Sequence, residues 1–490
     1  MTVGRYLMCI VLNRRGTWTL AATIILVWQL VIPPVVGLAN NGDFGKVIGI
    51  FNMQAPSGDD FLFADTRYEF SPRYHYRAQF YSTEQLLLLP ALALNWVFSK
   101  DGYFDLRWIG VVHAAILLIA FRLFEPLADG APRAMRLTML TLAVVIFCDV
   151  MYVNHLNSFY MDAGALVFLL LTAVLYLRVL RWRRSTDTAL LILCPALLVT
   201  SKAPHALLGL WIAVLLFATR RLLWPKTGRR FAIAALFLVS LSILWLWESA
   251  PKYYAFNGCY SVVFVQILPH AENVERTMAE LGLEQSWKSR IGTHAYDSKA
   301  RLDEPGVREA LMARLSYFKL ARFFLTHPRD AYVAMCVSLD EAGRQRVPFG
   351  NFDVRYGKPY AESRAFSMWS SLKNALFYHR GSRFLKCIAG FAAAFVLLLS
   401  VRRRSLPPGT FLAGLVLTGM MLTELAISSL ADAVDVTRHY LIFFALFDLI
   451  VMTIVWLVMM AYRSLSNRNR GSGDRALKKI TEGDLQPARP

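Results

Sequence analysis

Cysteine and acidic residues are scarce in this chain of 490 residues, which has six cysteines and 34 Asp and Glu against 53 Lys and Arg. The cysteines are scattered, without the close spacing of metal ligands. Four of them lie in or beside apolar segments and are predicted to be small core residues: Cys9, Cys148, Cys194 and Cys387. Cys259 and Cys336 lie in a large polar insertion, and whether they pair is left open by the sequence.

Nucleotide-binding and metalloenzyme signatures are missing from the insertion, residues 249–383. It has no phosphate-binding glycine loop, no GxGxxG, no HExxH and no Cys/His ligand set. The net charge of +19 would suit a nucleic acid partner, but the basic residues form no single patch. They stand in short clusters between apolar runs, as in proteins whose charges fix their membrane orientation. No nucleic acid partner is predicted.

Apolar sequence is abundant, with 56% hydrophobic residues and a mean hydropathy of +0.41, against about 45–50% in soluble domains. We therefore predict an all-α polytopic membrane protein whose helices cross a hydrocarbon core of about 30 Å. The ten predicted spans are 18–39, 108–124, 136–153, 162–180, 188–202, 204–219, 231–248, 384–401, 409–430 and 438–462.

The positive charges predict the topology. The basic clusters at 178–184, 220–230 and 402–404, the tail from Arg463, and the N-terminal Arg5, Arg14 and Arg15 should share the cytoplasmic side. They do so only if the ambiguous run 84–98 does not span. Its 15 residues reach about 22 Å, which is short of the core. We predict that 83–99 is a helix in the outer interface, with both termini cytoplasmic.

This topology divides the chain into four parts. Residues 1–248 form an N-terminal transmembrane module with an external loop at 40–107, and 249–383 form an external soluble domain. Residues 384–462 are the C-terminal spans. The polar tail 463–490 is predicted to be a disordered cytoplasmic segment.

The first candidate site follows the first apolar run, at Asn-Asn-Gly-Asp-Phe-Gly-Lys (40–46). Asn and Gly favour a sharp turn, which would hold the Asp43 carboxylate beside the bilayer, flanked by Asn41 and Lys46. Turn formation alone also explains these residues. Aromatic side chains in the rest of this loop are interpreted as interface anchors.

Two further clusters lie on the same predicted face. In 152–162, Asn157, Tyr160 and Asp162 lie between two spans, although an acid at a helix start also stabilises the helix dipole. Lys202 and His205 lie at the junction of two apolar runs, where a lysine either extends its amine outward or faces a polar cavity. Two carboxylates, Asp43 and Asp162, could hold a divalent ion or divide general-base work.

The fourth cluster enters the last span and contains Asp432, Asp435, Arg438 and His439. An arginine on the outer side goes against the positive-inside rule, so Arg438 needs an anionic partner. Asp435, three residues earlier, would supply one on a helix, which gives a purely structural ion pair. A lipid phosphate is the functional alternative.

The order of these motifs resembles the GT-C class of membrane glycosyltransferases, and more narrowly bacterial hexose transferases of surface-glycan assembly. The resemblance rests on Asn-Gly-Asp-Phe (41–44), Leu-Asn-Ser-Phe-Tyr (156–160), Ser-Lys (201–202) and Asp-x-x-Asp-x-x-Arg-His-Tyr (432–440), and in the insertion on Leu-Gly-Leu (281–283), His-Pro (327–328) and Trp-Ser-Ser-Leu (369–372). Relatives often have glutamate directly after the Asn-Ser-Phe-Tyr motif, where this chain has Met161 and the acid follows as Asp162. In the last motif they often have Lys-His, where this chain has Arg438-His439.

The resemblance implies a polyprenyl-phosphate-linked sugar as donor, a surface glycan or glycolipid as acceptor, and transfer of a hexose on the external face of the bacterial cytoplasmic membrane. It also implies that Asp43 is the base or a metal-associated acid. The leading hypothesis is an inverting glycosyltransferase in which Arg438, His439 and Lys202 bind the leaving phosphate and helix 84–98 lines the lipid groove. A divalent cation, Mg²⁺ or Mn²⁺, held by Asp43 and Asp162 is the cofactor class left open.

Two other functions remain open. A flippase or transporter of a lipid-linked or anionic solute would have ionisable residues near mid-membrane and repeat symmetry among its spans, and neither is evident in the sequence. A non-catalytic assembly partner would use the external domain to bind another protein.

Overall fold

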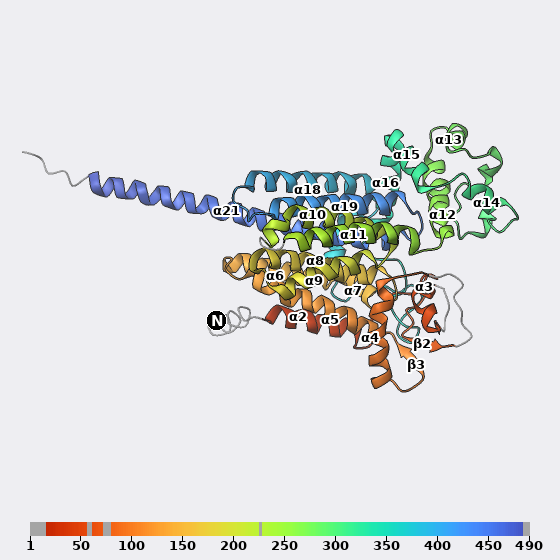
Figure 1. Ribbon diagram of the computed structural model, residues 1–490, viewed down its shortest axis with the longest axis horizontal. Helices are drawn as coiled ribbons and strands as arrows, with labels where there is room; N and C mark the ends of the chain where they lie inside the picture. Colours follow the sequence, from red (N-terminus) through yellow and green to blue (C-terminus); the bar gives the residue numbers. More distant parts are fainter. Residues whose placement is uncertain (1–15, 56–60, 72–79, 225–227, 484–490) are drawn as a thin grey trace, which may run out of the picture.

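The computed structural model describes residues 16–55, 61–71, 80–224 and 228–483, and shows a bundle of long, roughly parallel helices (Figure 1). By length and composition, seven helices in these ranges can cross a membrane. They are α5 (Arg107–Phe124), which continues into η2 (Glu125–Ala128), α8 (Asp162–Trp182), α10 (Ala206–Leu223), which follows η3 (Ala203–His205), α11 (Gly228–Glu248), α18 (Gly381–Arg402), α19 (Thr410–Leu430) and α21 (Leu441–Gly483).

A bent pair, α6 (Arg133–Phe147) and α7 (Val150–Leu156), which meet at an angle of 56°, forms either an eighth, broken span or a re-entrant loop. Asp149 lies at the bend, where its side chain caps α7 by accepting from the Met151 amide. The other two predicted spans correspond to shorter apolar helices, α2 (Thr17–Leu30) and α9 (Ser185–Val199). The prediction of a helical polytopic membrane protein is confirmed, with seven or eight full-length spans where the sequence predicted ten.

The first helix is shorter than predicted. It ends at Leu30, not at residue 39, because Pro33 and Pro34 have no amide hydrogen to continue the helical ladder. The chain then runs without regular structure to the first candidate site. Its amides at Gly37 and Ala39 donate to the carbonyls of residues 351 and 350. A side chain at position 350 would collide with the Leu62 carbonyl, at 1.9 Å from the added Cβ, so glycine permits this close approach.

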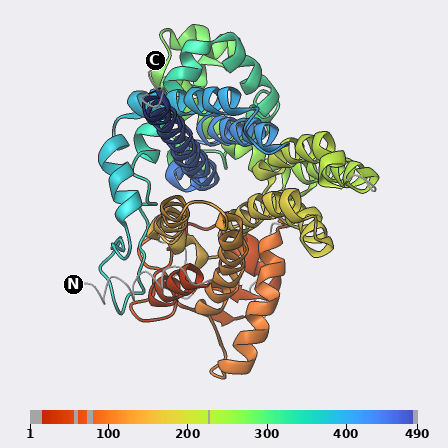
Figure 2. The same cartoon turned by 90° about the vertical axis from the view of Figure 1, so that its left-hand side faces the viewer.

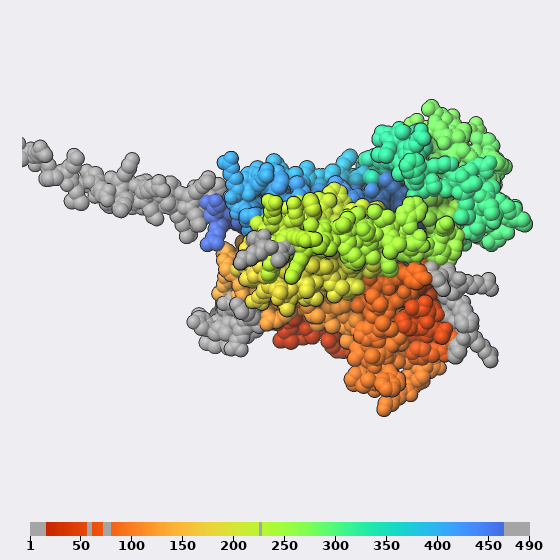
Figure 3. Space-filling model, viewed as in Figure 1, coloured from red at the N-terminus to blue at the C-terminus, as the bar shows by residue number. Residues whose placement is uncertain are grey.

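The two ends of the bundle differ in composition. Basic residues gather where α8, α10 and α18 end, on the left of Figure 1, which we call the basic end. They are the clusters at 178–184 and 402–404 and the arginines Arg220 and Arg221. The segment between α11 and α18 projects from the opposite, insertion end, as Figure 3 also shows. The N-terminal arginines lie outside the described residues. Helix α21 continues to Gly483, through most of the tail predicted to be disordered, since an existing helix extends without a new nucleation cost.

A helix and a small sheet cover the insertion end of the first spans. Helix α4 (Thr83–Phe98) runs across the ends of the bundle helices, as expected for an interfacial helix (Figure 1). Its outer face exposes Leu86, Leu89 and Trp96. Beside it lie three antiparallel strands in the order β1 (Met53–Gln54), β2 (Arg67–Phe70) and β3 (Tyr103–Asp105). The sequence did not predict this sheet, because strands of two to four residues show no alternating pattern.

The insertion is built from α12 (Lys252–Ser261), the π-helical turn η4 (Val262–Ile267), η5 (Leu268–His270), α13 (Val274–Leu281), η6 (Gln285–Arg290), η7 (Ser298–Ala300), α14 (Val307–Met312), α15 (Tyr317–Thr326), α16 (Pro328–Ala342) and α17 (Met368–Phe377). Its first part, up to Ala334, has a hydrophobic core of its own. From Leu339 onward its apolar side chains join the core of the bundle. Cys259 and Cys336 are both free thiols, which answers the pairing question.

A buried ion pair connects this second part to the last span. Asp448 in α21 accepts from Lys373 Nζ at 3.0 Å, from the Trp369 indole at 2.8 Å and from the Tyr152 hydroxyl at 2.7 Å. The Asp149 side chain also caps the N-terminus of α17, where it accepts from the amides of Trp369 and Ser370. The insertion is therefore held to the membrane helices by buried polar groups as well as by apolar packing.

Breaking this pair should be costly. We expect Asp448→Ala to destabilise the protein by about 3–5 kcal/mol, because Lys373 would be left charged and buried. The thermal unfolding midpoint in detergent measures the effect. Glu280→Ala breaks exposed pairs with Arg276 and His327 and should leave the midpoint close to that of the natural chain. Equal midpoints for both variants would contradict the assigned role.

Candidate active site

The turn that holds Asp43 forms as the sequence predicted. The side chain of Asn40 accepts from the amides of Gly42 and Phe44, and that of Asn41 accepts from the amide of Asp43. Gly42 has a φ of +96°, which favours glycine. The short helix α3 (Gly45–Ile48) follows and points the Lys46 amine back onto the Asp43 carboxylate.

The start of α8 supplies the second carboxylate. Asp162 is buried and receives Lys202 Nζ at 3.1 Å on each oxygen. His205 Nε2 lies 3.2 Å from the same carboxylate, and its Nδ1 lies 3.0 Å from Glu424 Oε1 of α19. Three spans, α8, α10 and α19, thus meet through one chain of buried polar groups.

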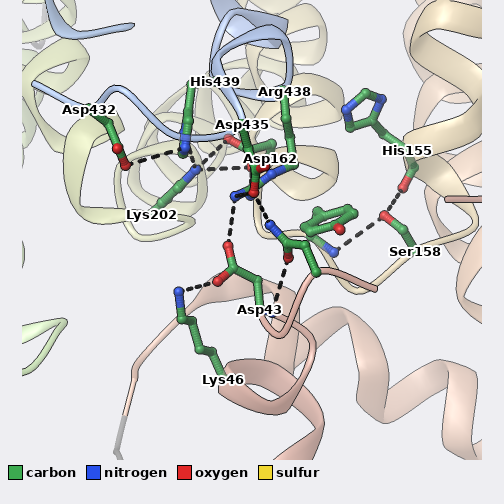
Figure 4. A network of polar contacts seen from close by, with 12 residues as sticks. Asp43, Lys46, His155, Ser158, Asp162, Lys202, Asp432, Asp435, Arg438 and His439 are labelled. Atoms are coloured by element: carbon green, nitrogen blue, oxygen red, sulfur yellow. Dashed lines mark hydrogen bonds and ion pairs between the residues drawn. The ribbon is translucent and has the colours of Figure 1, made fainter. Parts of the chain in front are cut away.

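Arg438 joins the two carboxylates. It lies in the four-residue helix α20 (Val436–His439), and its side chain is 4% exposed. One guanidinium nitrogen is 2.8 Å from Asp43 Oδ2, and the other is 3.5 Å from Asp162 Oδ2 (Figure 4). The Asp435 carboxylate lies 3.8 Å from the guanidinium, and the guanidinium carbon packs 4.6 Å from the centre of the Tyr160 ring. Four segments distant in the sequence, around residues 43, 162, 202 and 438, therefore meet at the insertion end.

The remaining predicted residues are arranged around this centre. Lys202 Nζ lies 3.3 Å from His439 Nδ1, and His439 Nε2 lies 3.5 Å from Asp432 Oδ2. Asn41 donates to Asp435. Asn157 lies outside the charged cluster, and donates instead to the carbonyls of Leu30 and Val36, which fixes the chain after α2.

Sequence reasoning missed Glu424 and the aromatic wall around Lys46. Glu424 stands inside an apolar run, and an ionisable residue within a span is itself a signal of a polar site. The Lys46 amine lies 4.3 Å from the centre of the Tyr254 ring and 5.1 Å from that of Phe80. Tyr254 belongs to α12, so the insertion also contributes a wall of the site.

The cavity at this site has a volume of about 20 Å³, which is room for about one water molecule. Its lining contains Asp43, Asp162, Lys202, Arg438, Phe80, Tyr81, Phe159, Tyr160, Met161, Ala203, Pro204, Ser249, Ala250 and Tyr254. The charged groups pair with one another across this space. A ligand larger than a water molecule must therefore separate them.

The two predicted metal ligands do not share a metal-like arrangement. Asp43 and Asp162 share the Arg438 guanidinium, whose positive charge opposes a cation between them. Within the described residues, no three His, Cys, Asp or Glu side chains are grouped to hold a metal ion. The donor set therefore does not fit a divalent cation, and we assign no step to one.

Neighbouring charges set the protonation states. Burial raises the pKa of Asp43, but Lys46 and Arg438 outweigh it and hold that pKa well below its ordinary value. Burial, Lys202 and Arg438 together hold the pKa of His439 well below its ordinary value, so this imidazole is neutral. The positive charge of the predicted Arg438-His439 pair is therefore that of Arg438 alone, whose own pKa is raised by Asp43 against the effect of burial.

The depressed pKa of Asp43 predicts acid sensitivity. A carboxyl whose pKa is lower folded than unfolded stabilises the fold above its unfolded value of about 3.9, and this contribution is lost as the pH falls through the folded pKa. The unfolding midpoint should thus keep the Asp43 contribution from pH 8 to about 5 and lose it below about 4. Asp43→Asn should flatten the acid part of the curve, and parallel curves for the two proteins would contradict this.

Comparison with known proteins assigns the family. A family model described as the YfdI N-terminal transmembrane domain matches residues 15–482. The chain belongs to this family. The YfdI model covers the bundle, the insertion and every residue of the charged cluster. No curated protein and no solved structure matches the chain.

Proposed function

We propose that this YfdI-family protein is a membrane glycosyltransferase that moves a hexose from a polyprenyl-phosphate donor to a cell-surface glycan or glycolipid. The observation that carries the proposal is the Arg438 guanidinium placed between Asp43 and Asp162 at the insertion end of the bundle. It puts a phosphate-binding cation within hydrogen-bond distance of a candidate base. By the positive-inside rule the basic end faces the cytoplasm, so the site faces outward.

The donor phosphate would enter by competing for the cations. Buried Arg438 is already balanced by carboxylates, but its Nε has no hydrogen-bond partner among the described residues. A guanidinium binds phosphate oxygens through two parallel hydrogen bonds, which makes the exchange of a carboxylate for a phosphate favourable. Lys202, on the other side of Asp162, supplies the second cation.

This exchange would also prepare the base. While Arg438 and Lys46 hold its pKa low, Asp43 is a weak proton acceptor. When Arg438 turns to the phosphate, the Asp43 carboxylate loses a counter-charge and becomes more basic. It then takes the proton of the acceptor hydroxyl, whose oxygen bonds to the anomeric carbon as the bond from that carbon to the phosphate oxygen breaks. The polyprenyl phosphate leaves with the electron pair, held by Arg438 and Lys202.

The surroundings suit a substrate that remains in the membrane. Helix α4 lies across the ends of the spans and exposes Leu86, Leu89 and Trp96, which are suited to contact with lipid. Its first turn lies close to the site, because Gln85 donates to the carbonyls of Lys46 and Phe80. The lipid tail of the donor would lie along α4 while its phosphate enters the charged cluster.

A transporter of anionic solutes has less support. The large cavity inside the bundle is lined almost entirely by apolar side chains, with arginines at the basic end only. An anion crossing there would lose its hydration without charged or polar replacement.

The direct test is transfer from a panel of polyprenyl-phosphate sugars by the purified full-length chain, with radiolabelled hexose recovered in the acceptor. We expect one donor to support transfer, with release of polyprenyl phosphate in equal amount. Movement of the intact donor across the membrane of reconstituted vesicles, without transfer of the hexose, would favour a flippase and contradict the proposal.

A further inference from the structure

A second, larger cavity lies inside the bundle on the side of the basic end. Its volume is about 740 Å³, and it is lined by α5, α6, α8, α10, α18, α19 and α21. The lining is apolar over most of its extent, with side chains such as Met139, Leu170, Phe395, Met420 and Trp456. It lies between the helices of the first half of the chain and those of the last, which face each other in the view of Figure 2.

This cavity is separate from the candidate active site. The two share no lining residue among those described. Asp162 of the site and Leu169 of the cavity lie two turns apart on α8, about 10 Å at 1.5 Å per residue. On α19, Met420 of the cavity lies one turn below Glu424, which pairs with buried His205. An occupant of the cavity therefore need not reach the active site.

Arginines surround the end of the cavity away from the active site. Arg136 lies 3.6 Å from Asp129, and Arg181 donates to the carbonyls of Leu127 and Asp129. Arg183, which follows α8, is exposed, and its side chain makes no ion pair or hydrogen bond with the residues that the structure describes. Its positive charge is thus available to a ligand at the mouth of an apolar chamber.

We propose that this cavity binds one anionic phospholipid from the leaflet at the basic end, with its acyl chains inside and its phosphate against Arg183. A mostly apolar lining offers ordered water few polar partners, whereas hydrocarbon chains fill such a space at the density of a protein interior. A guanidinium at the mouth selects a head group with net negative charge. The lipid would fill the space between the two halves of the bundle. This inference does not rest on the proposed transferase activity.

The charge part is tested by native mass spectrometry of the delipidated full-length chain in detergent. The probes are phosphatidylglycerol and phosphatidylcholine with the same acyl chains. We expect one tightly bound phosphatidylglycerol, at least about tenfold tighter than phosphatidylcholine. Arg183→Glu should abolish this preference. Arg184→Glu changes the same charge at the next position, which is outside the cavity lining, and should retain it. Equal binding of the two lipids by the natural chain would overturn the proposal.

The cavity part is tested by filling the space. Ala173 on α8 and Ala413 on α19 both line the cavity, and replacing both with Phe should reduce phosphatidylglycerol binding at least about tenfold. Ala394→Phe adds a ring to an exposed position of α18 and should leave binding unchanged. Size-exclusion chromatography checks that the filled variant is folded. If the filled variant misfolds, Arg183→Glu, which leaves the cavity intact, still tests whether the lipid head group binds at the mouth of the cavity. Unchanged lipid binding in the folded, filled variant would overturn the proposal.

Discussion

Arg438→Ala should reduce transfer by about 10²–10³-fold and destabilise the fold by about 3–5 kcal/mol. The guanidinium is buried and contacts Asp43 at 2.8 Å, Asp162 at 3.5 Å and Asp435 at 3.8 Å. Its removal leaves three carboxylates with one counter-charge fewer and takes away the main cation that we propose for the donor phosphate. Initial rates with the active donor and the thermal unfolding midpoint measure the two effects.

Arg438→Lys separates the two roles of this residue. Lysine keeps the charge but has no planar fork to reach Asp43 and Asp162 together. We therefore expect most of the stability to return and the transfer rate to remain at least tenfold low. Arg276→Ala, at an exposed pair of the insertion, is the control and should leave both quantities near those of the natural chain. A fully active Arg438→Ala variant would remove this residue from the mechanism.

Asp43→Asn should reduce the turnover number by about 10²–10⁴-fold, the usual contribution of a general base. Asparagine has the same shape, and its one carbonyl oxygen can accept from Lys46 or from Arg438, which donate to different oxygens of Asp43. The turn should persist, because it depends on Asn40, Asn41 and Gly42. Donor binding should change much less than turnover. Rates measured across donor concentrations distinguish the two.

The matched control for Asp43 is Asp101→Asn, in the same first loop but exposed, where Asp101 pairs with Arg67 and accepts from the Tyr103 amide. It should retain full activity. If Asp43→Asn instead weakened donor binding and left turnover intact, Asp43 would be a binding residue and the base would have to be sought elsewhere. Asp162, enclosed by Lys202, His205 and Arg438, would then be the next carboxylate to test.

Some features could be read from the sequence because they are local. A span is a run of apolar residues as long as the bilayer is thick, so seven helices were predicted close to where they lie. The turn at residues 40–46 follows from Asn and Gly preferences within a few residues. The end of α2 was misplaced because apolar composition was given more weight than Pro33 and Pro34, although the proline rule was also local.

Which polar residues belong to the site was only partly visible. The shared predicted face brought together Asp43, Asp162, Lys202 and Arg438 correctly, since topology places loops at one end of a bundle. The predicted topology gave no information on which of these charged side chains pair with one another. For Arg438 the sequence favoured Asp435, three residues away, as the structural partner, but the shortest contact is to Asp43, 395 residues away.

The sequence by itself determined that this is a helical membrane protein with a charged cluster at one end, because hydrophobic length, charge position and turn chemistry are properties of short segments. The tertiary structure decided that Arg438 bridges Asp43 and Asp162, that His205 connects Asp162 to Glu424, and that an apolar cavity lies below them. These features depend on how distant helices pack, and packing geometry is fixed by many weak contacts that no single segment contains.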